Sequence, residues 1–384
     1  MPPYLAGREF ESNEFKRLLK QHIVLENLIL TGLRGVGKTV LLETFKPLAI
    51  QSGWVWVGTD LSETASLSET HLATRLLADI SVVTSSIVIA IKDTKAIGFA
   101  QKGVQEVNLG FDVLTGIFQN TPGLASDKLK SVLEFAWGHI KKRGAKGIVF
   151  AYDEAQNLDD HSIKDEYPLS LVLDVFQSLQ RKNIPVMLAL AGLPTLFPKL
   201  VEARTFSERM FHTLTLDRLG ESDSAKAILE PIKKAKCPVT LSDSAIQAIV
   251  AASGGYPYFI QFICREVFDS YLQSGGKQPI IGEITRKLDA DFFVGRWSKA
   301  TDRQRELMWV VANLETSDKE FTVQEVAEKA SDILEKPFSP SQINQMFNTL
   351  STAGLIYKNR HGKYSFAVPL LGEFILRQAL IDQR

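Results

Sequence analysis

A glycine-rich stretch near the start of the chain, TGLRGVGKTVLLETF over Thr31–Phe45, constrains the fold more than any other segment. It sets four residues between Gly32 and Gly37 and follows them with Lys38 and Thr39, which is the spacing of a phosphate-binding loop. Glycines permit positive φ angles, so successive backbone N–H groups can point at one anion. The stretch therefore predicts a turn that binds phosphate and leads into a helix.

The residues on either side of the loop support that prediction. Leu28–Leu30 is typical of a short buried strand, and TVLLETF begins a helix whose N-terminus favours negative charge. Lys38 would reach the β- and γ-phosphates of ATP, and the Thr39 hydroxyl would ligate Mg²⁺. A glycine loop without a ligand is the alternative. The predicted nucleotide-binding residues are Gly32, Leu33, Arg34, Gly35, Val36, Gly37, Lys38, Thr39 and Val40.

A second segment supplies acidic groups. KGIVFAYDEAQNL, over Lys146–Leu158, has an apolar run that ends in Asp153 and Glu154. A buried parallel strand would deliver both carboxylates at its C-terminal edge. Asp153 would hold Mg²⁺, and Glu154 would activate the attacking water. The alternative is an ordinary strand followed by an acidic helix cap.

Together these motifs resemble the AAA+ ATPases, in particular the origin-recognition and replication-initiator-like ATPases and the signal-transduction (STAND-like) ATPases. Two further stretches carry the resemblance: LAGREFESNEF over Leu5–Phe15, and GGYPYFIQFICREVF over Gly254–Phe268. The resemblance implies that Arg8 lines the adenine pocket. It also implies that Pro257 lies near the base and that Arg265 is a second-sensor cation.

The resemblance extends to the next strand, IPVMLALAGLPTLFPKL, which is similar to the sensor strand of the family. No polar side chain stands at Ala191–Pro194, where the family offers one, so we expect slow hydrolysis. Arg209 precedes a predicted strand over Phe211–Leu216 and would complete the catalytic site of a neighbouring subunit in a homo-oligomer. The alternative is a surface arginine that pairs with Glu202 or Glu208.

Trp54–Leu61 predicts a further strand, and residues 94–118 predict an insertion with a hairpin around KGVQEVNLGFDV. From Arg218 the pattern becomes helical. Thr301, Thr322 and Ser339 each stand three residues before Gln or Glu, which predicts three capped helices. LIYKNRHGKYSFAVP predicts two strands after them. We therefore expect an α/β fold: a P-loop AAA+ core with a parallel sheet over residues 1–217, a helical lid over 218–298 and a winged helix over 299–384.

A winged helix commonly places its third helix in the major groove of double-stranded DNA. No acidic residue lies between Ser339 and Tyr364, although residues 299–384 carry eleven basic and eleven acidic side chains. Contact with a protein effector is therefore the alternative to contact with DNA. The predicted DNA-binding residues are Asn344, Gln345, Asn348, Lys358, Arg360 and Lys363.

Composition restricts the classes of partner and the cellular location that we expect. The 44 basic and 44 acidic side chains balance, so overall charge favours no polyanion. Two cysteines exclude a disulfide framework, and the run over Ile80–Ile91 is too short to span a bilayer. We expect a cytoplasmic protein with no membrane partner that hydrolyses Mg-ATP slowly and couples its lid to the winged helix. The alternative is a signalling or defence ATPase whose winged helix binds protein and whose ATP form oligomerises. A third interpretation is a nucleotide-binding scaffold without turnover, because the sensor strand offers no polar side chain.

Overall fold

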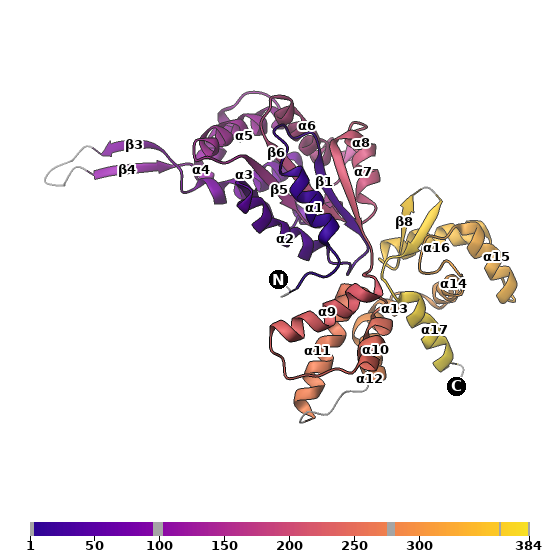
Figure 1. Ribbon diagram of the computed structural model, residues 1–384. Coiled ribbons are helices and arrows are strands. Elements are labelled where there is room, and N and C mark those ends of the chain that lie inside the picture. Colours follow the sequence, from indigo (N-terminus) through magenta and orange to yellow (C-terminus); the bar gives the residue numbers. More distant parts are fainter. Residues whose placement is uncertain (1–3, 95–102, 275–280, 361, 383–384) are drawn as a thin grey trace. The chain divides into compact units, whose positions relative to one another are not determined.

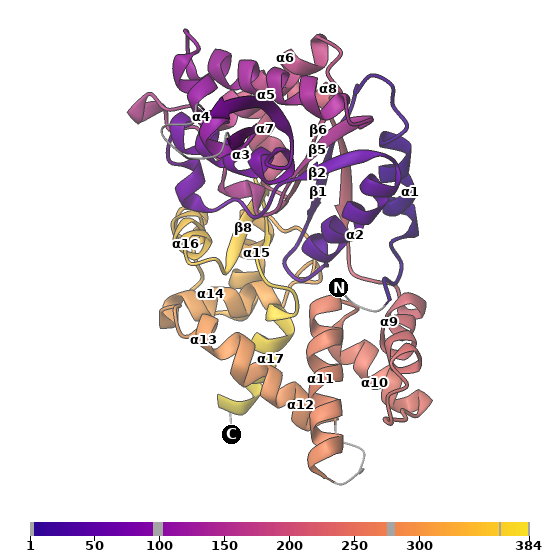
Figure 2. The same cartoon turned by 90° about the vertical axis from the view of Figure 1, so that its left-hand side faces the viewer.

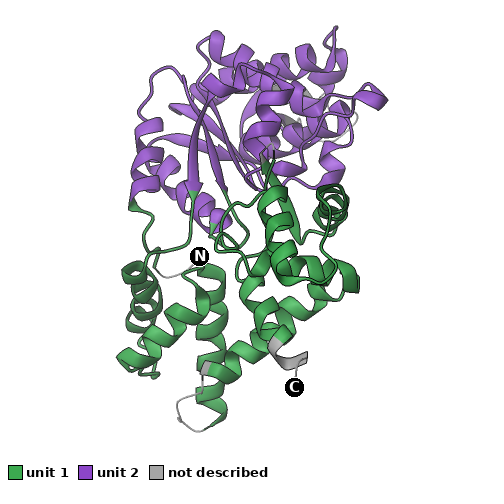
Figure 3. Ribbon diagram, turned by 90° about the vertical axis from the view of Figure 1, so that its right-hand side faces the viewer, with its two compact units in different colours: residues 1–9, 32–37, 216–384 green, residues 10–31, 38–215 purple. Residues whose placement is uncertain are grey.

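The structure is a computed structural model, and it falls into two compact units (Figure 3). The first six residues of the glycine loop belong to unit 1, and Lys38 belongs to unit 2. Unit 1 comprises Met1–Glu9, Gly32–Gly37 and Leu216–Arg384, and unit 2 comprises Phe10–Thr31 and Lys38–Thr215. The structure describes residues 4–94, 103–274, 281–360 and 362–382.

A five-stranded sheet in the order β2-β5-β6-β1-β7 forms the centre of unit 2 (Figure 1). The pairs β2–β5, β5–β6 and β6–β1 are parallel. Every residue of β1, β5 and β6 is buried, which explains their continuous apolar sequences. The strand predicted over Phe211–Leu216 is confirmed as β7. The bounds are β1 Asn27–Gly32, β2 Trp54–Val57, β5 Gly147–Tyr152, β6 Val186–Gly192 and β7 Phe211–Leu216.

Helices cover both faces of this sheet. On one face, Phe15 of α1 stacks on Phe45 of α2 with ring centroids 4.3 Å apart, and Phe15 meets Trp56 of β2 edge-on. On the other face, a buried cluster joins Ile29 and Phe150 of the strands to side chains of α3, α5 and α6. The helices are α1 Glu9–Leu18, α2 Lys38–Gln51, α3 Glu69–Thr84, α5 Ala125–Lys141, α6 Pro168–Arg181, α7 Leu196–Ala203 and α8 Ser207–Met210, with short 3₁₀ turns η1 Glu63–Ser66, η2 Ala155–Asn157 and η3 Ser162–Lys164.

The predicted insertion forms an antiparallel hairpin, β3 (Val88–Thr94) and β4 (Gly103–Asn108), which projects from the rest of unit 2 in Figure 1. Residues 95–102 of the insertion lie outside the described residues. The hairpin begins earlier than the sequence suggested. The FDV residues start α4 (Phe111–Asn120) instead of completing a strand, because Gly110 occupies the N-cap of this helix and Leu114 is buried. No helix among the described residues is long and apolar enough to cross a membrane.

Unit 1 begins its helical part after β7. Its packing depends on the pair Gly254 and Gly255, which have φ angles of 56° and 76°. A Cβ on Gly255 would lie 2.4 Å from the Leu219 carbonyl oxygen, so no larger residue fits there. The elements are α9 Glu221–Lys234, α10 Asp243–Ser253, α11 Pro257–Gln273, α12 Ile281–Leu288, the π-helix η4 Asp289–Phe293 and α13 Val294–Trp297.

The C-terminal part of unit 1 contains three helices, a hairpin and a last helix (Figure 2). The three predicted caps are confirmed, because Thr301, Thr322 and Ser339 each form a capping box. The two predicted strands are also present and antiparallel, and residue 361 of their turn lies outside the described residues. The elements are α14 Asp302–Ala312, α15 Val323–Ile333, α16 Pro340–Thr352, β8 Ile356–Arg360, β9 Lys363–Phe366 and α17 Leu371–Asp382.

Candidate nucleotide-binding site

The glycine loop has the backbone that its sequence predicts. Gly32, Gly35 and Gly37 have φ angles of 155°, 81° and 92°. A Cβ on Gly32 would lie 2.4 Å from the Leu216 carbonyl oxygen, so this position admits glycine alone. Such a succession of positive φ angles turns backbone N–H groups to one side and suits an anion. The loop therefore fits a phosphate group.

Arg8 supports the loop within unit 1. Its side chain is buried, and its Nη2 donates to the carbonyl oxygens of Val36 (3.1 Å) and Asp217 (2.6 Å). A charged donor shared by two carbonyls fixes the loop to the chain that follows β7. Val36 is itself buried. The structure thus gives Arg8 a bracing contact, and its predicted contact with adenine stays a prediction.

In unit 2, the residues predicted to bind the metal are neighbours. Asp153 directly follows β5, and its Oδ2 accepts a hydrogen bond from the Thr39 hydroxyl at the start of α2. Asp153 is 4% exposed, and Lys38 is also buried. A carboxylate beside a hydroxyl offers the oxygen ligands that Mg²⁺ prefers. Within the described ranges, no group of three or more His, Cys, Asp or Glu side chains could hold a metal ion.

Glu154 adopts a left-handed conformation, with φ 52° and ψ 33°. A non-glycine residue in this region costs energy and occurs most often where function requires it. The backbone N–H of Glu154 donates to Asp153 Oδ1 at 2.8 Å, and the Glu154 carboxylate accepts from the Gln156 amide. Each Asp153 oxygen therefore has a donor, and the direction of the Glu154 side chain is set by Gln156.

Gln156 contacts the predicted catalytic residue Glu154, and the sequence interpretation did not include it. Its Oε1 accepts from the Leu193 N–H at 3.1 Å, just beyond the end of β6. A Cβ on Gly192 would lie 2.9 Å from that same oxygen. The side chain of Gln156 thus lies over the stretch where the family's polar sensor residue was expected and not found. The polar residue two positions after Glu154, in the sequence DEAQ, was the available clue.

The lid residues implied by the resemblance have different surroundings in unit 1. Pro257 is the first residue of α11, and its Cγ would lie 3.9 Å from a Cβ on Gly37, which puts it beside the loop. Arg265 lies two turns further along, over the ring of Phe262, and pairs with Glu266 at 3.4 Å. Lys287 also bonds Glu266, at 2.6 Å, and these partners lower the pKa of that carboxyl. Arg265 as a phosphate contact stays a prediction.

The two arginines before β7 differ in their partners. Arg204 donates to both carboxylate oxygens of Asp174, at 3.0 and 2.8 Å. Arg209 is exposed on α8 and forms no ion pair with Glu202 or Glu208 in the part of the chain that the structure describes. The side chain of Arg209 therefore remains available to a neighbouring molecule.

The residues predicted to bind DNA lie on α16 and on the hairpin after it. Ile343 and Phe347 of α16 are buried, which leaves its outer face to exposed polar side chains. That face includes Asn344, Gln345 and Asn348. On the hairpin, Lys358 is exposed and Lys363 is half-buried, and the side chain of Arg360 lies outside the described residues.

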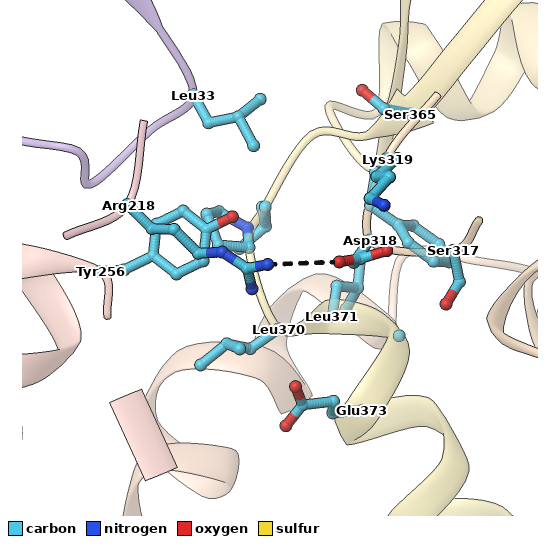
Figure 4. A pocket seen from close by; sticks show the side chains of 14 residues that line it. Leu33, Arg218, Tyr256, Ser317, Asp318, Lys319, Ser365, Leu370, Leu371 and Glu373 are labelled. Atoms are coloured by element: carbon cyan, nitrogen blue, oxygen red, sulfur yellow. Dashed lines mark ion pairs between the residues drawn. The ribbon is translucent and has the colours of Figure 1, made fainter. Parts of the chain in front are cut away.

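A small pocket in unit 1 lies beside the segment that leads from β9 into α17 (Figure 4). Arg218 points across it to Asp318, with their charged atoms 3.6 Å apart, and Glu373 lies at its edge. Burial raises the pKa of the Glu373 carboxyl. The cavity measures about 70 Å³, room for a few water molecules and far less than a nucleotide needs. It is not the nucleotide site.

The five-stranded sheet, the glycine loop and the Asp153–Thr39 pair give this chain an α/β fold similar to that of the P-loop AAA+ proteins. Solved structures with this fold match nearly the whole chain. The Walker-type ATPase PABY2304 of Pyrococcus abyssi has a TM-score of 0.59 at 15% identity, with 97% of this chain and 96% of that chain covered. The ORC2 protein of Aeropyrum pernix has a TM-score of 0.55 at 12% identity, covering 100% and 96%.

A third structure, Cdc6p from Pyrobaculum aerophilum, gives a TM-score of 0.50 at 17% identity, with 100% and 96% of the two chains covered. These likenesses confirm the predicted fold class of the core. Among curated proteins, none matches the sequence. A family described as "Domain of unknown function (DUF8462)" matches residues 290–375, which begin in η4 and end in α17.

Proposed function

We propose that this chain is an ATP-dependent molecular switch that binds and slowly hydrolyses Mg-ATP. One observation carries the proposal: the Thr39 hydroxyl, directly after the glycine loop, is hydrogen-bonded to Asp153 at the end of β5. Two residues 114 positions apart thereby present oxygen ligands side by side. The A. pernix ORC2 protein, which has a similar fold, was solved in complexes with ADPNP and ADP.

Each residue of the site has a role in this proposal. The amides of the glycine loop and Lys38 would hold the phosphates. Thr39 and Asp153 would hold a Mg²⁺ ion, which when bound would supply positive charge beside the phosphates. Glu154 takes the proton of the attacking water, and its left-handed backbone and its bond to Gln156 fix its direction. Hydrolysis is slow because no polar side chain from the end of β6 helps to orient the water.

The switch operates through differential binding. ATP moves a lid, residues 218–298, only to the extent that it binds one lid position better than the other. The lid in turn governs a winged helix over residues 299–384. The order of three helices followed by an antiparallel hairpin supports that assignment.

Double-stranded DNA is the proposed partner of the winged helix. The exposed amides of Asn344, Gln345 and Asn348 suit base edges, and Lys358 suits the phosphate backbone. Fluorescence anisotropy with duplex DNA should show an affinity that falls steeply with salt and that weakens in Lys358→Ala. Lys336→Ala, outside the predicted contacts, is the control. Salt-independent binding, or none with and without ATP, would instead favour a protein effector.

Arg209 supports a proposal about assembly. Because it is exposed and pairs with neither neighbouring glutamate among the described residues, it suits the role of an arginine supplied to the next subunit. Arg209→Ala should then lower turnover while ATP affinity is retained, and ATP should increase the mass seen by light scattering. A fully active monomer would exclude this role.

The ATPase itself is tested by Glu154→Gln. We expect Mg-ATP affinity to persist while phosphate release falls by about 10²- to 10⁴-fold, the usual contribution of a general base. Glu134→Gln is the matched control, because Glu134 of α5 also lies in unit 2 but pairs with Lys182, the residue after α6. Calorimetry that detects no binding of ATP by the wild-type chain would refute the proposal, and an unchanged rate in Glu154→Gln would refute the assigned base.

A further inference from the structure

Arg296 is an arginine that none of the motifs singled out. It lies on the short helix α13, and its guanidinium stands over the ring of Phe292 at 4.1 Å from the centroid. Its Nη1 also donates to the Phe292 carbonyl oxygen at 2.6 Å. One donor is therefore used, and the stacked guanidinium keeps its remaining N–H groups for another acceptor.

Aromatic contacts connect Arg296 to the glycine loop within unit 1. The rings of Phe292 and Tyr258 are 5.2 Å apart, and the Tyr258 N–H donates to the Gly35 carbonyl at 3.1 Å. A Cβ on Gly35 would lie 3.0 Å from Tyr258 Cβ, so the two backbones are in close contact. The platform on which Arg296 is stacked thus rests on the loop itself.

The loop presents a second arginine, Arg34, next to Gly35. Arg34 is exposed, and its charge lowers the pKa of Arg296, in addition to the larger effect of burial. Within the described ranges neither arginine forms an ion pair. Two neighbouring positive charges without an acid raise the energy of the empty protein, and an anion would relieve that cost.

We propose that Arg296 and Arg34 form an anion subsite that takes the outermost phosphate of the nucleotide bound by the loop. This inference rests on the proposed function and deepens it. A guanidinium suits the purpose because it stays charged and can donate two parallel hydrogen bonds to phosphate oxygens. Arg265, the arginine implied by the resemblance, is already held by Glu266.

The segment that carries Arg296 also contacts the last helix. Phe293 stacks on Phe374 of α17 with centroids 5.1 Å apart, and Asp289 accepts from Arg377 at 3.0 and 2.6 Å. Asp289 and Phe293 are the first and last residues of the π-helix η4, a conformation that is rare and frequently marks functional sites. A phosphate bound by Arg296 would therefore contact the same segment that packs against α17. Through this contact, the matched segment over residues 290–375 would respond to the bound nucleotide.

The test compares two nucleotides in the full chain. Calorimetry with Mg-ATPγS and with Mg-ADP measures the affinity of wild type, Arg296→Ala and Arg296→Lys. We expect Arg296→Ala to weaken ATPγS by about 10- to 100-fold, the range for hydrogen bonds to a charged group, and ADP by less than about threefold. Arg296→Lys, which keeps the charge but loses the fork of donors, should fall between wild type and alanine.

Two further variants serve as a control and as a replacement for Arg296→Ala. Arg303→Ala is the matched control, because Arg303 stands over Phe338 at 3.9 Å in the same unit and pairs with Glu306. It should change neither affinity. Arg34→Ala should reproduce the selective loss of ATPγS without disturbing the aromatic platform. It therefore replaces Arg296→Ala if thermal unfolding shows that Arg296→Ala does not fold.

The outcomes separate the two proposals. Equal losses for ATPγS and ADP, or no loss for either, in a folded arginine variant would overturn the subsite while the proposed function stands. A wild-type chain that binds neither nucleotide would overturn the proposed function, and the subsite with it. Selective loss of ATPγS in Arg296→Ala and in Arg34→Ala, with Arg303→Ala unchanged, would establish the subsite.

Discussion

The acidic edge of unit 2 and the glycine loop of unit 1 satisfy their charges in different ways. At the edge, both oxygens of Asp153 accept hydrogen bonds from Thr39 and Glu154, and the Glu154 carboxylate accepts from Gln156. At the loop, burial and, to a smaller extent, the charge of Arg34 lower the pKa of Arg296, and no acid among the described residues pairs with either arginine. The acidic edge therefore has its hydrogen-bond partners within the chain, whereas we propose that the two arginines find theirs in a bound anion.

This difference indicates which parts of the site are prepared before a ligand arrives. Preorganised acceptors lose little on binding, because the chain has already ordered them. A pair of like charges works the other way, since its unfavourable interaction is relieved when an anion binds between the two charges. We therefore infer that residues of the edge contribute mainly to turnover and that the arginines contribute mainly to discrimination between nucleotides.

The largest effect is expected from Asp153→Asn at the edge. An amide can still accept from the Glu154 N–H, but its NH₂ group is a poor metal ligand and opposes the Thr39 hydroxyl donor. Loss of the metal site removes several kcal/mol of transition-state stabilisation, roughly a thousandfold in rate. Phosphate release should fall accordingly, and ATP affinity should lose its dependence on Mg²⁺.

Asp174→Asn is the control for that experiment, because Asp174 also lies in unit 2 but pairs with Arg204 on the surface. Its turnover and Mg²⁺ dependence should match wild type. If ATP binding by Asp153→Asn still depends on Mg²⁺, the acidic edge is not the metal site. The inference that this edge contributes mainly to turnover would then be wrong.

A smaller effect on turnover is expected from substitutions of Gln156. They test whether this side chain orients Glu154 or only stabilises the fold. Gln156→Ala removes one hydrogen bond to a charged group, so turnover should fall by about 10-fold or more with ATP affinity unchanged. Gln156→Glu keeps the acceptor for the Leu193 N–H but sets a second carboxylate against Glu154. Its stability should stay near that of wild type while its turnover falls further. Full activity in Gln156→Glu would show that Gln156 serves the fold alone.

Most of the fold could be predicted from the sequence because the determinants are local. Glycine spacing fixed the loop, an apolar run ending in two acids marked β5, and hydroxyl caps marked three helix starts. The structure of the insertion was harder to predict, because short apolar patterns occur in both hairpins and helices. Gly110 could precede a strand or a helix, and the residues after it form α4, in which Leu114 is buried.

The candidate site was predictable only where one motif contained it. Thr39 and Asp153 followed from their motifs, whereas Gln156 and Arg296 did not. The role of Gln156 depends on where the end of β6 lies, and the role of Arg296 depends on an aromatic contact between residues 34 positions apart in sequence. Such contacts come from tertiary packing, and no spacing rule describes them.

The smallest effect tests the charged half of the comparison without any ligand. In nucleotide-free protein, Arg34→Ala removes a repulsion and no ion pair, so the free energy of unfolding should stay within about 0.5 kcal/mol of wild type or rise slightly. Any rise should shrink with added salt, because Arg34 is exposed. Arg204→Ala, which loses its pairing with Asp174, should instead lose up to about 1 kcal/mol. Urea unfolding at low and high salt measures the free energy of unfolding of both variants. If Arg34→Ala is destabilised as much as Arg204→Ala, the loop arginine already has a stabilising partner in the nucleotide-free protein. The two regions would then not differ as inferred.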